Sequence, residues 1–253
     1  MLLPRVIPVL LLKGRGLVKG VGFSRHVYVG DPINAVKIFD AKEVDELLIF
    51  DITATKEKRI PPLELVQKVA DQCLMPFGVG GGITSVEHAR RILAAGAEKV
   101  CLNTAALENL DLVSELASQF GTQSVVVCLD VKRGWIGGTG VYTRCASKRI
   151  SADPVQAARL MAAKGAGEIV INDVTRDGTM SGYGLELIAQ VASAVDVPVI
   201  ALGGCGSLQH IRQAFEAGAQ AAAAGAYFVF HGPKRAVLIT YPGKEELAGV
   251  RGE

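Results

Sequence analysis

The sequence has few aromatic residues, little net charge and no regularly spaced cysteines. Its 253 residues carry a formal net charge of +2 and only 6% aromatic side chains. No basic stripe with interleaved aromatics occurs, so we expect no nucleic-acid partner. The cysteines lack CxxC spacing and are odd in number: Cys73, Cys101, Cys128, Cys145 and Cys205. Such a set favours reduced thiols in the cytoplasm over a disulfide framework or a zinc site.

Long hydrophobic runs are absent as well. The apolar N-terminal segment contains Pro4, Arg5 and Pro8, is too short to span a bilayer, and is followed by no small-residue cleavage site. We therefore interpret this segment as a buried first strand and expect no membrane association. No metal-ligand cluster and no nucleophilic triad is visible, and we expect neither a metal nor another cofactor.

Short apolar runs separated by helix-like stretches are abundant instead. Runs bounded by Gly, Pro or charged residues predict eight buried strands: Arg5–Leu12, Glu46–Asp51, Pro76–Val79, Lys99–Asn103, Ser124–Asp130, Glu168–Asp173, Pro198–Leu202 and Ala221–Ala224. Helices are expected at Ile33–Glu43, Pro62–Gln72, Ser85–Ala95, Pro154–Lys164, Gly184–Ala194 and Ser207–Ala217. Strands without polar–apolar alternation indicate a parallel sheet covered by helices. Eight of them without a linker favour one α/β domain, a closed (β/α)8 or TIM barrel, over an open sheet. We expect an irregular tail from Gly232.

An internal repeat divides the chain into two halves. Pro76–Ala97 matches Pro198–Ala219 at a constant offset of 122, including a Pro, a Gly-Gly pair, Ser, His and Ala-Gly-Ala. The first strand, with Leu11, also aligns with the fifth strand, with Asp130. The repeat predicts two half-barrels, residues 1–121 and 122–253.

Glycines at the carboxyl ends of the strands indicate anion binding. Gly80–Gly82 follows the third strand and Asn103–Thr104 ends the fourth. Glycines let backbone N–H groups approach an anion, and a following helix N-terminus adds a favourable dipole. The repeat places a second such site at Gly203–Gly204 and Gly225–Ala226, near Asp177–Thr179. Two symmetric sites predict a small molecule with a phosphate at each end, although each loop alone could be only a tight turn.

Asp130 is the main candidate for acid–base chemistry, because it ends the fifth strand between the two anion sites. An alternative role is to anchor a loop. Weaker candidates on the same rim are Lys19, Asp51 and Asp173. Lys13 and Lys132 could attract phosphates or be solvated, His26 could reach the mouth, and Trp135 could cover a ligand or fill a gap. His88 and His210 follow Ser85 and Ser207 by three residues, which indicates helix capping rather than metal binding.

Four charged residues open strands at the opposite rim: Arg5, Glu46, Lys99 and Glu168. Isolated buried charges are costly, so two cations and two anions at the barrel floor should pair into a ring. The ring could be a structural plug or a gate to the barrel interior.

The sequence resembles the cyclase subunit of imidazole glycerol phosphate synthase, the HisF family, over nearly its whole length. The motifs that carry the resemblance are GDP (30–32), DELLIFDITA (45–54), FGVGGGI (77–83), KVCLNTAA (99–106), VVVCLDVKR (125–133), GAGEIVIN (165–172), RDGTMSGY (176–183) and GGCG (203–206). The resemblance implies two phosphate sites and a glutaminase partner at the barrel floor, with ammonia passing through the barrel. It assigns one phosphate to Gly82, Asn103 and Thr104, the other to Asp177, Gly178, Gly204 and Gly225, and a gate to Arg5, Glu46, Lys99 and Glu168.

One departure from the family concerns the chemistry. The family ends its first strand with a catalytic aspartate, whereas this chain has Leu11 in IPVLLLK. Cyclisation needs proton transfers on both sides of the forming ring, and one carboxylate is missing. Lesser departures are Asn172, Thr175, Leu202 and Ala226.

These features resemble a divergent branch in bacterial surface-polysaccharide pathways, where the barrel and a glutaminase supply ammonia to a protein that amidinates an N-acetyl sugar. A second hypothesis is a true histidine-pathway cyclase that converts PRFAR and ammonia into imidazole glycerol phosphate and AICAR. A third is a non-catalytic scaffold for the glutaminase and the amidinating enzyme. Leu11 argues against the second.

Overall fold

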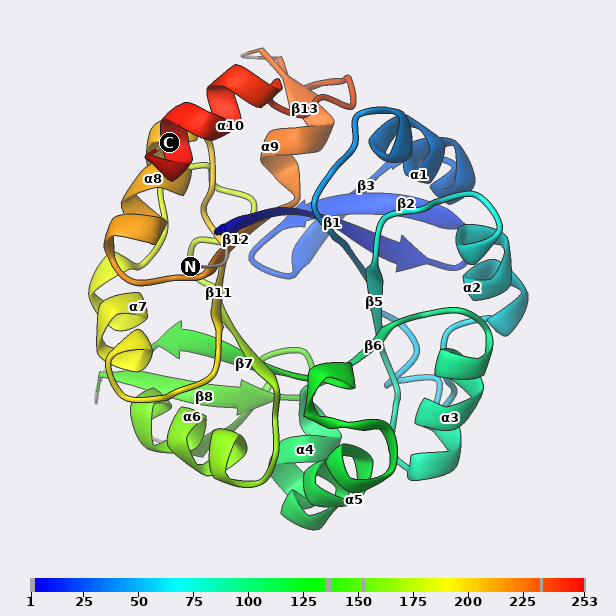
Figure 1. Cartoon of the computed structure of the whole chain (residues 1–253), viewed down its shortest axis with the longest axis vertical. Helices are drawn as coiled ribbons and strands as arrows, with labels where there is room; N and C mark the ends of the chain where they lie inside the picture. Colours follow the sequence, from blue (N-terminus) through cyan, green and yellow to red (C-terminus); the bar gives the residue numbers. More distant parts are fainter. Residues whose placement is uncertain (1–2, 135–137, 152, 233, 253) are drawn as a thin grey trace.

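A computed structural model shows the chain as a closed (β/α)8 barrel (Figure 1) and describes residues 3–134, 138–151, 153–232 and 234–252. Trp135 lies outside the described residues. The barrel strands follow the order β1 (Arg5–Lys13), β4 (Leu47–Asp51), β5 (Phe77–Gly80), β6 (Lys99–Leu102), β7 (Val125–Arg133), β10 (Glu168–Asp173), β11 (Val199–Leu202) and β12 (Ala221–Ala224). All neighbours in this ring are parallel, and β12 pairs with β1 to close it. The predicted fold class and all eight strands are confirmed.

The strands have two apolar faces, because one face lines the barrel interior and the other packs against helices. The interior cluster consists of Ile7, Val9, Leu48, Cys101, Val126, Cys128, Val170, Ile200, Ala221 and Ala223. The larger cluster between sheet and helices includes Leu10, Leu12 and Phe39. This double burial explains why the strands are continuous apolar runs in the sequence.

Helices surround the barrel (Figure 1): α1 (Pro32–Ala41), α2 (Leu63–Ala70), α3 (Val86–Ala94), α4 (Thr104–Glu108), α5 (Leu110–Phe120), α6 (Pro154–Ala163), α7 (Leu185–Ala192), α8 (Leu208–Glu216), α9 (Ala226–Val229) and α10 (Lys244–Arg251). The six predicted helices are present with slightly shorter bounds. The tail from Gly232 is not irregular throughout, because α10 packs Leu247 and Val250 into the core. The predicted capping is also confirmed, since Ser85 and Ser207 accept hydrogen bonds from the backbone N–H groups of His88 and His210.

Two antiparallel hairpins extend from the barrel sheet and were not predicted; a separate short antiparallel pair, β13 (Phe230–His231) and β14 (Ala236–Val237), lies in the tail. β2 (Gly16–Val21) and β3 (Ser24–Gly30) follow β1, whereas β8 (Thr139–Thr143) and β9 (Lys148–Ser151) follow β7. Both follow the carboxyl end of a barrel strand, which is the ligand-binding side of this fold. Of the described helices, none combines the length and apolar character needed to cross a membrane.

Candidate functional site

A cavity of about 550 Å³ opens at the carboxyl ends of the barrel strands. Among the residues predicted for the ligand site, those that line it are Lys19, Gly82, Asn103, Thr104, Asp130, Asp177, Gly178 and Gly225. Gly204 does not line the cavity; a Cβ there would lie 2.1 Å from the carbonyl oxygen of Gly182. The volume suits a small-molecule ligand.

Asp130 is a buried acid in the wall of this cavity. Burial raises the pKa of Asp130 to about 7; the hydrogen bond from Asn172 opposes the shift, and the nearby carboxylate of Asp177 adds to it. A carboxyl group that titrates near neutral pH can either donate or accept a proton there. The strand end therefore supplies one side chain suited to acid–base chemistry.

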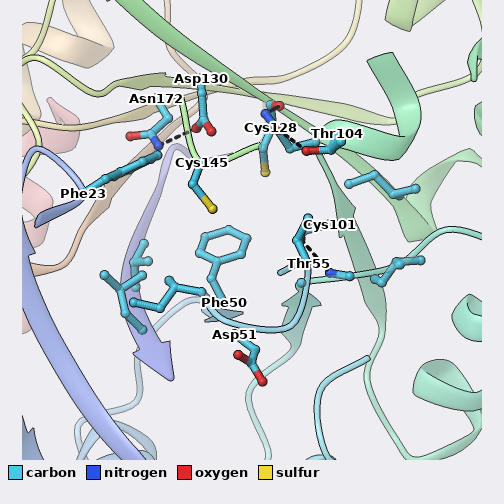
Figure 2. A pocket seen from close by; sticks show the side chains of 18 of the residues that line it. Phe23, Phe50, Asp51, Thr55, Cys101, Thr104, Cys128, Asp130, Cys145 and Asn172 are labelled. Carbon is cyan, nitrogen blue, oxygen red and sulfur yellow. Dashed lines mark hydrogen bonds between the residues drawn. The ribbon is translucent and has the colours of Figure 1, made fainter. Parts of the chain in front are cut away.

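Asn172 is the immediate neighbour of Asp130. The two residues pair in register across β10 and β7, and Asn172 Nδ2 donates a 2.8 Å hydrogen bond to Asp130 Oδ1 (Figure 2). Asn172 Oδ1 is the one buried side-chain N or O atom in the described part of the chain without a hydrogen-bond partner. The sequence marked Asn172 only as a departure, because its pairing with Asp130 depends on the strand register.

Leu11 occupies the wall opposite Asp130. Three barrel strands separate β1 from β7 in either direction around the ring, so the two strands are diametrically opposed. Leu11 lines the cavity together with Phe50, its register partner on β4, and both pack on the apolar interior cluster. This side of the mouth therefore offers apolar surface where a second acid would be needed for two-sided proton transfer.

Lys19 lies on β2 with only 5% of its surface exposed. Its Nζ donates a hydrogen bond to the carbonyl oxygen of Val9. Burial lowers the pKa of Lys19 to about 8, against the attraction of Asp177. Gly225 leaves room for this ammonium group, because a Cβ at that position would lie 2.3 Å from Nζ. Lys19 is thus a buried cation facing the predicted second phosphate region.

The first predicted phosphate region lies between β5 and α4. Gly82 has φ +63°, and a Cβ there would lie 1.8 Å from the carbonyl oxygen of Arg59, so the turn requires glycine. Asn103 Nδ2 donates a 2.9 Å hydrogen bond to the carbonyl oxygen of Cys128, and Thr104 Oγ1 accepts a 3.0 Å hydrogen bond from the backbone N–H of Arg144. Glycine therefore has a steric role at this turn, and phosphate binding here remains a prediction.

The structure separates the weaker candidates named from the sequence. Asp51 and Asp173 anchor their own loops: Asp51 pairs with Arg59 at 2.5 Å, and Asp173 accepts from the backbone N–H of Thr175 at 3.0 Å. His26 lines the cavity, whereas Lys13 and Lys132 are exposed outside its lining.

At the amino ends of the strands, the predicted ring of charges is confirmed. Arg5 pairs with both Glu46 and Glu168, the latter at 2.6 Å. Lys99 Nζ lies 2.8 Å from Glu46 and 3.0 Å from Glu168. Burial alone would lower the pKa of Arg5, but the two adjacent carboxylates raise it above its usual value. Each cation bridges both anions, so the ring closes the barrel floor.

Together, these features define a (β/α)8 barrel with an acid-containing cavity at its mouth and a charged ring at its floor. The profile of the family described as histidine biosynthesis protein matches residues 5–233. A Pseudomonas aeruginosa relative with the provisional name imidazole glycerol phosphate synthase subunit hisF2 is 48% identical over 244 residues, which is 96% of this chain and 97% of the relative. An Exiguobacterium sibiricum relative named imidazole glycerol phosphate synthase subunit HisF is 41% identical over 231 residues, which is 90% of this chain and 91% of the relative. The chain belongs to this family and to its HisF-like cyclase-subunit group.

Proposed function

We propose that this chain is an ammonia-conducting subunit that pairs with a glutaminase at its floor and delivers ammonia to the mouth for amidination of a sugar in O-antigen biosynthesis. The observation that carries the proposal is an asymmetry between the two ends of the barrel. The floor has its complete ring of four charges, whereas Leu11 occupies the wall opposite Asp130.

The floor ring supports a transport role because stability alone does not require it. Replacing a buried ion network with well-packed apolar residues is often neutral or stabilising. The interior beyond the ring is apolar and includes small side chains such as Ala221 and Ala223. Such an interior favours neutral ammonia over ammonium, because burying an unpaired cation is costly.

Relatives also bear on the specific role. A Vibrio vulnificus relative, 44% identical over 248 residues, is provisionally named subunit hisF3, beside the hisF2 name of the Pseudomonas relative. Numbered names fit proteins that exist beside an ordinary histidine-pathway subunit. Neighbouring genes discriminate the alternatives: sugar-modifying genes favour the proposed role, and histidine genes favour a true cyclase.

The test of conduction uses Lys99→Met, which removes the ammonium group but keeps a side chain of similar length. The substitution is made in a chain that also carries Leu11→Asp, and PRFAR is the substrate that accepts the ammonia. Glutamine-dependent and ammonia-dependent turnover can then be measured separately in the co-purified glutaminase complex. We expect Lys99→Met to change only the glutamine-dependent rate, with Lys99→Arg as the charge-retaining control.

Equal effects on both rates would show that the ring is a structural plug. If PRFAR turnover is too low to measure, glutamine hydrolysis by the complex replaces it. A hydrolysis rate unaffected by the presence of the barrel chain would contradict the pairing itself. Turnover of PRFAR by the wild-type chain at the rate of an ordinary family member would favour the cyclase hypothesis instead.

A further inference from the structure

The two hairpins at the mouth carry basic side chains and no acidic ones. Residues 13–30 and 132–151, which contain the hairpins β2–β3 and β8–β9, hold nine of the chain's 27 Lys and Arg residues and none of its 25 Asp and Glu residues. With these nine set aside, the rest of the chain has 18 Lys and Arg against 25 Asp and Glu. The net charge of +2 therefore conceals a strongly positive mouth, which attracts a partner of opposite charge.

Most of these basic side chains lie outside the mouth cavity. Lys19 is buried, and the other eight are exposed: Lys13, Arg15, Arg25, Lys132, Arg133, Arg144, Lys148 and Arg149. The described lining of the cavity includes none of the eight. Arg144 and Lys148 pair with Glu108 of α4. Within the described part of the chain, the five that precede Arg144 in this list form no ion pair. A small ligand inside the cavity would leave these five unpaired, whereas an acidic surface that covers the mouth could pair with them.

The position of the hairpins also fits a large partner. They stand on opposite sides of the mouth (Figure 1), because the strands that they follow, β1 and β7, are diametrically opposed. β3 pairs only with β2, and β9 only with β8, so each hairpin ends in an edge strand. These two strands expose Val27 by 59%, Tyr28 by 65% and Ile150 by 38%. Exposed aromatic and apolar side chains beside arginines are typical of a protein interface.

We infer that the two hairpins form a docking surface for an acidic protein, namely the sugar-amidinating enzyme that uses the ammonia. This inference rests on the proposed function, in which ammonia is released at the mouth between the hairpins. An acidic rim around that enzyme's ammonia entrance would contact both hairpins and hold the entrance over the cavity. Charged residues on an edge strand also oppose aggregation, but acidic side chains serve that purpose too. Protection of the edges therefore does not explain why both hairpins lack acids.

The experiment measures, by surface plasmon resonance, how the full chain in complex with its glutaminase binds the purified sugar-amidinating enzyme that is encoded beside it. Binding should weaken steeply as salt rises from about 0.05 M to about 0.5 M, because salt screens exposed charges. The double variants Arg15→Glu/Arg25→Glu and Lys132→Glu/Arg133→Glu should each weaken binding about tenfold or more at low salt. Tyr28→Ser should weaken it at both salt concentrations, because the loss of apolar contact is not screened.

The matched control is Lys37→Glu/Lys68→Glu, which makes the same change of charge at exposed positions on α1 and α2 and should bind as the wild type does. A thermal melt and unchanged pairing with the glutaminase show that each variant is folded. Equal losses in the control, or unchanged binding in both hairpin variants, would overturn the inference. Tighter binding of duplex DNA or phosphatidylglycerol vesicles than of the enzyme would also overturn it, because the surface would then be a general site for polyanions.

Failure of this inference is distinguishable from failure of the proposed function. If the enzyme does not bind while glutamine-dependent turnover shows that the glutaminase complex conducts ammonia, the docking surface is refuted and the proposed function stands. If histidine genes occupy the place of the amidinating enzyme's gene, the proposed function is contradicted, and this choice of partner is refuted with it.

Discussion

Leu11→Asp should raise the cyclase activity of this chain. The substitution places a carboxylate diametrically opposite Asp130 in the same cavity. Lys19 helps to keep the new group ionised, because its side chain reaches back to the carbonyl oxygen of Val9 on the same strand as residue 11. Two acids would then flank a bound substrate, as two-sided proton transfer requires.

The magnitude follows from the role of the missing group. A positioned acid or base contributes about 10²–10⁴-fold to a rate. We expect a gain of about 10²-fold, at the lower end, because Phe50 on the neighbouring strand still presents apolar surface beside the new carboxylate. Exchanging a half-buried leucine for aspartate should lower the free energy of unfolding by about 1–3 kcal/mol, which a stable barrel tolerates.

The assay is ammonia-dependent consumption of PRFAR by the purified chain, with a thermal melt to show that each variant is folded. Leu11→Asn is the matched control, because it has nearly the same shape but cannot exchange a proton. Equal rates for the Asp and Asn variants would refute the acid–base argument. A wild-type rate already typical of the family would refute the premise that Leu11 limits the chemistry.

Two further predictions concern the mouth. Asp130→Asn should raise the free energy of unfolding most above pH 7, because ionising a buried carboxyl with a pKa of about 7 destabilises the fold. This gain should shrink by about 3 kcal/mol between pH 8.5 and pH 5, where the folded state already holds the proton, and urea unfolding at both pH values measures it. A pH-independent difference would contradict the assigned shift. Crystals grown with sulfate or phosphate should show anions at two loops, Gly82–Asn103–Thr104 and Gly204–Gly225. Density confined to other surfaces would contradict the two-site prediction.

The barrel could be predicted from the sequence because its strands are buried on both faces. Runs such as Val125–Leu129 contain no polar residue, and the repeat fixes their order. The two hairpins left a weaker signal, since β3 is largely exposed and an edge strand gains little from burial. α10 was missed because the tail from Gly232 carries Pro242, whereas the helix begins only after that proline, with Gly243 as its N-cap.

The site was predictable where function depends on position along a strand. Asp130 and the four floor charges stand at strand ends, so the fold alone brings them to one rim or the other. The free oxygen of Asn172 was not predictable, because it depends on which atom of the amide faces Asp130. The superposition of residues 1–121 on 122–253 stays a prediction, as does the role of each phosphate residue.

Within the proposed function, Lys99 is a better candidate than Arg5 for the ring member that moves. Arg5 engages one carboxylate with each terminal nitrogen of a planar guanidinium, an arrangement that is lost if the group rotates. Lys99 reaches both carboxylates with a single ammonium group on a flexible stem, so small rotations can exchange its partners. When Lys99 withdraws, Glu46 and Glu168 each retain a hydrogen bond from Arg5, and neither charge is left unpaired. Since Lys99 would likewise keep both carboxylates paired if Arg5 withdrew, it is the single ammonium group on a flexible stem that favours Lys99, which is why the conduction test substitutes it.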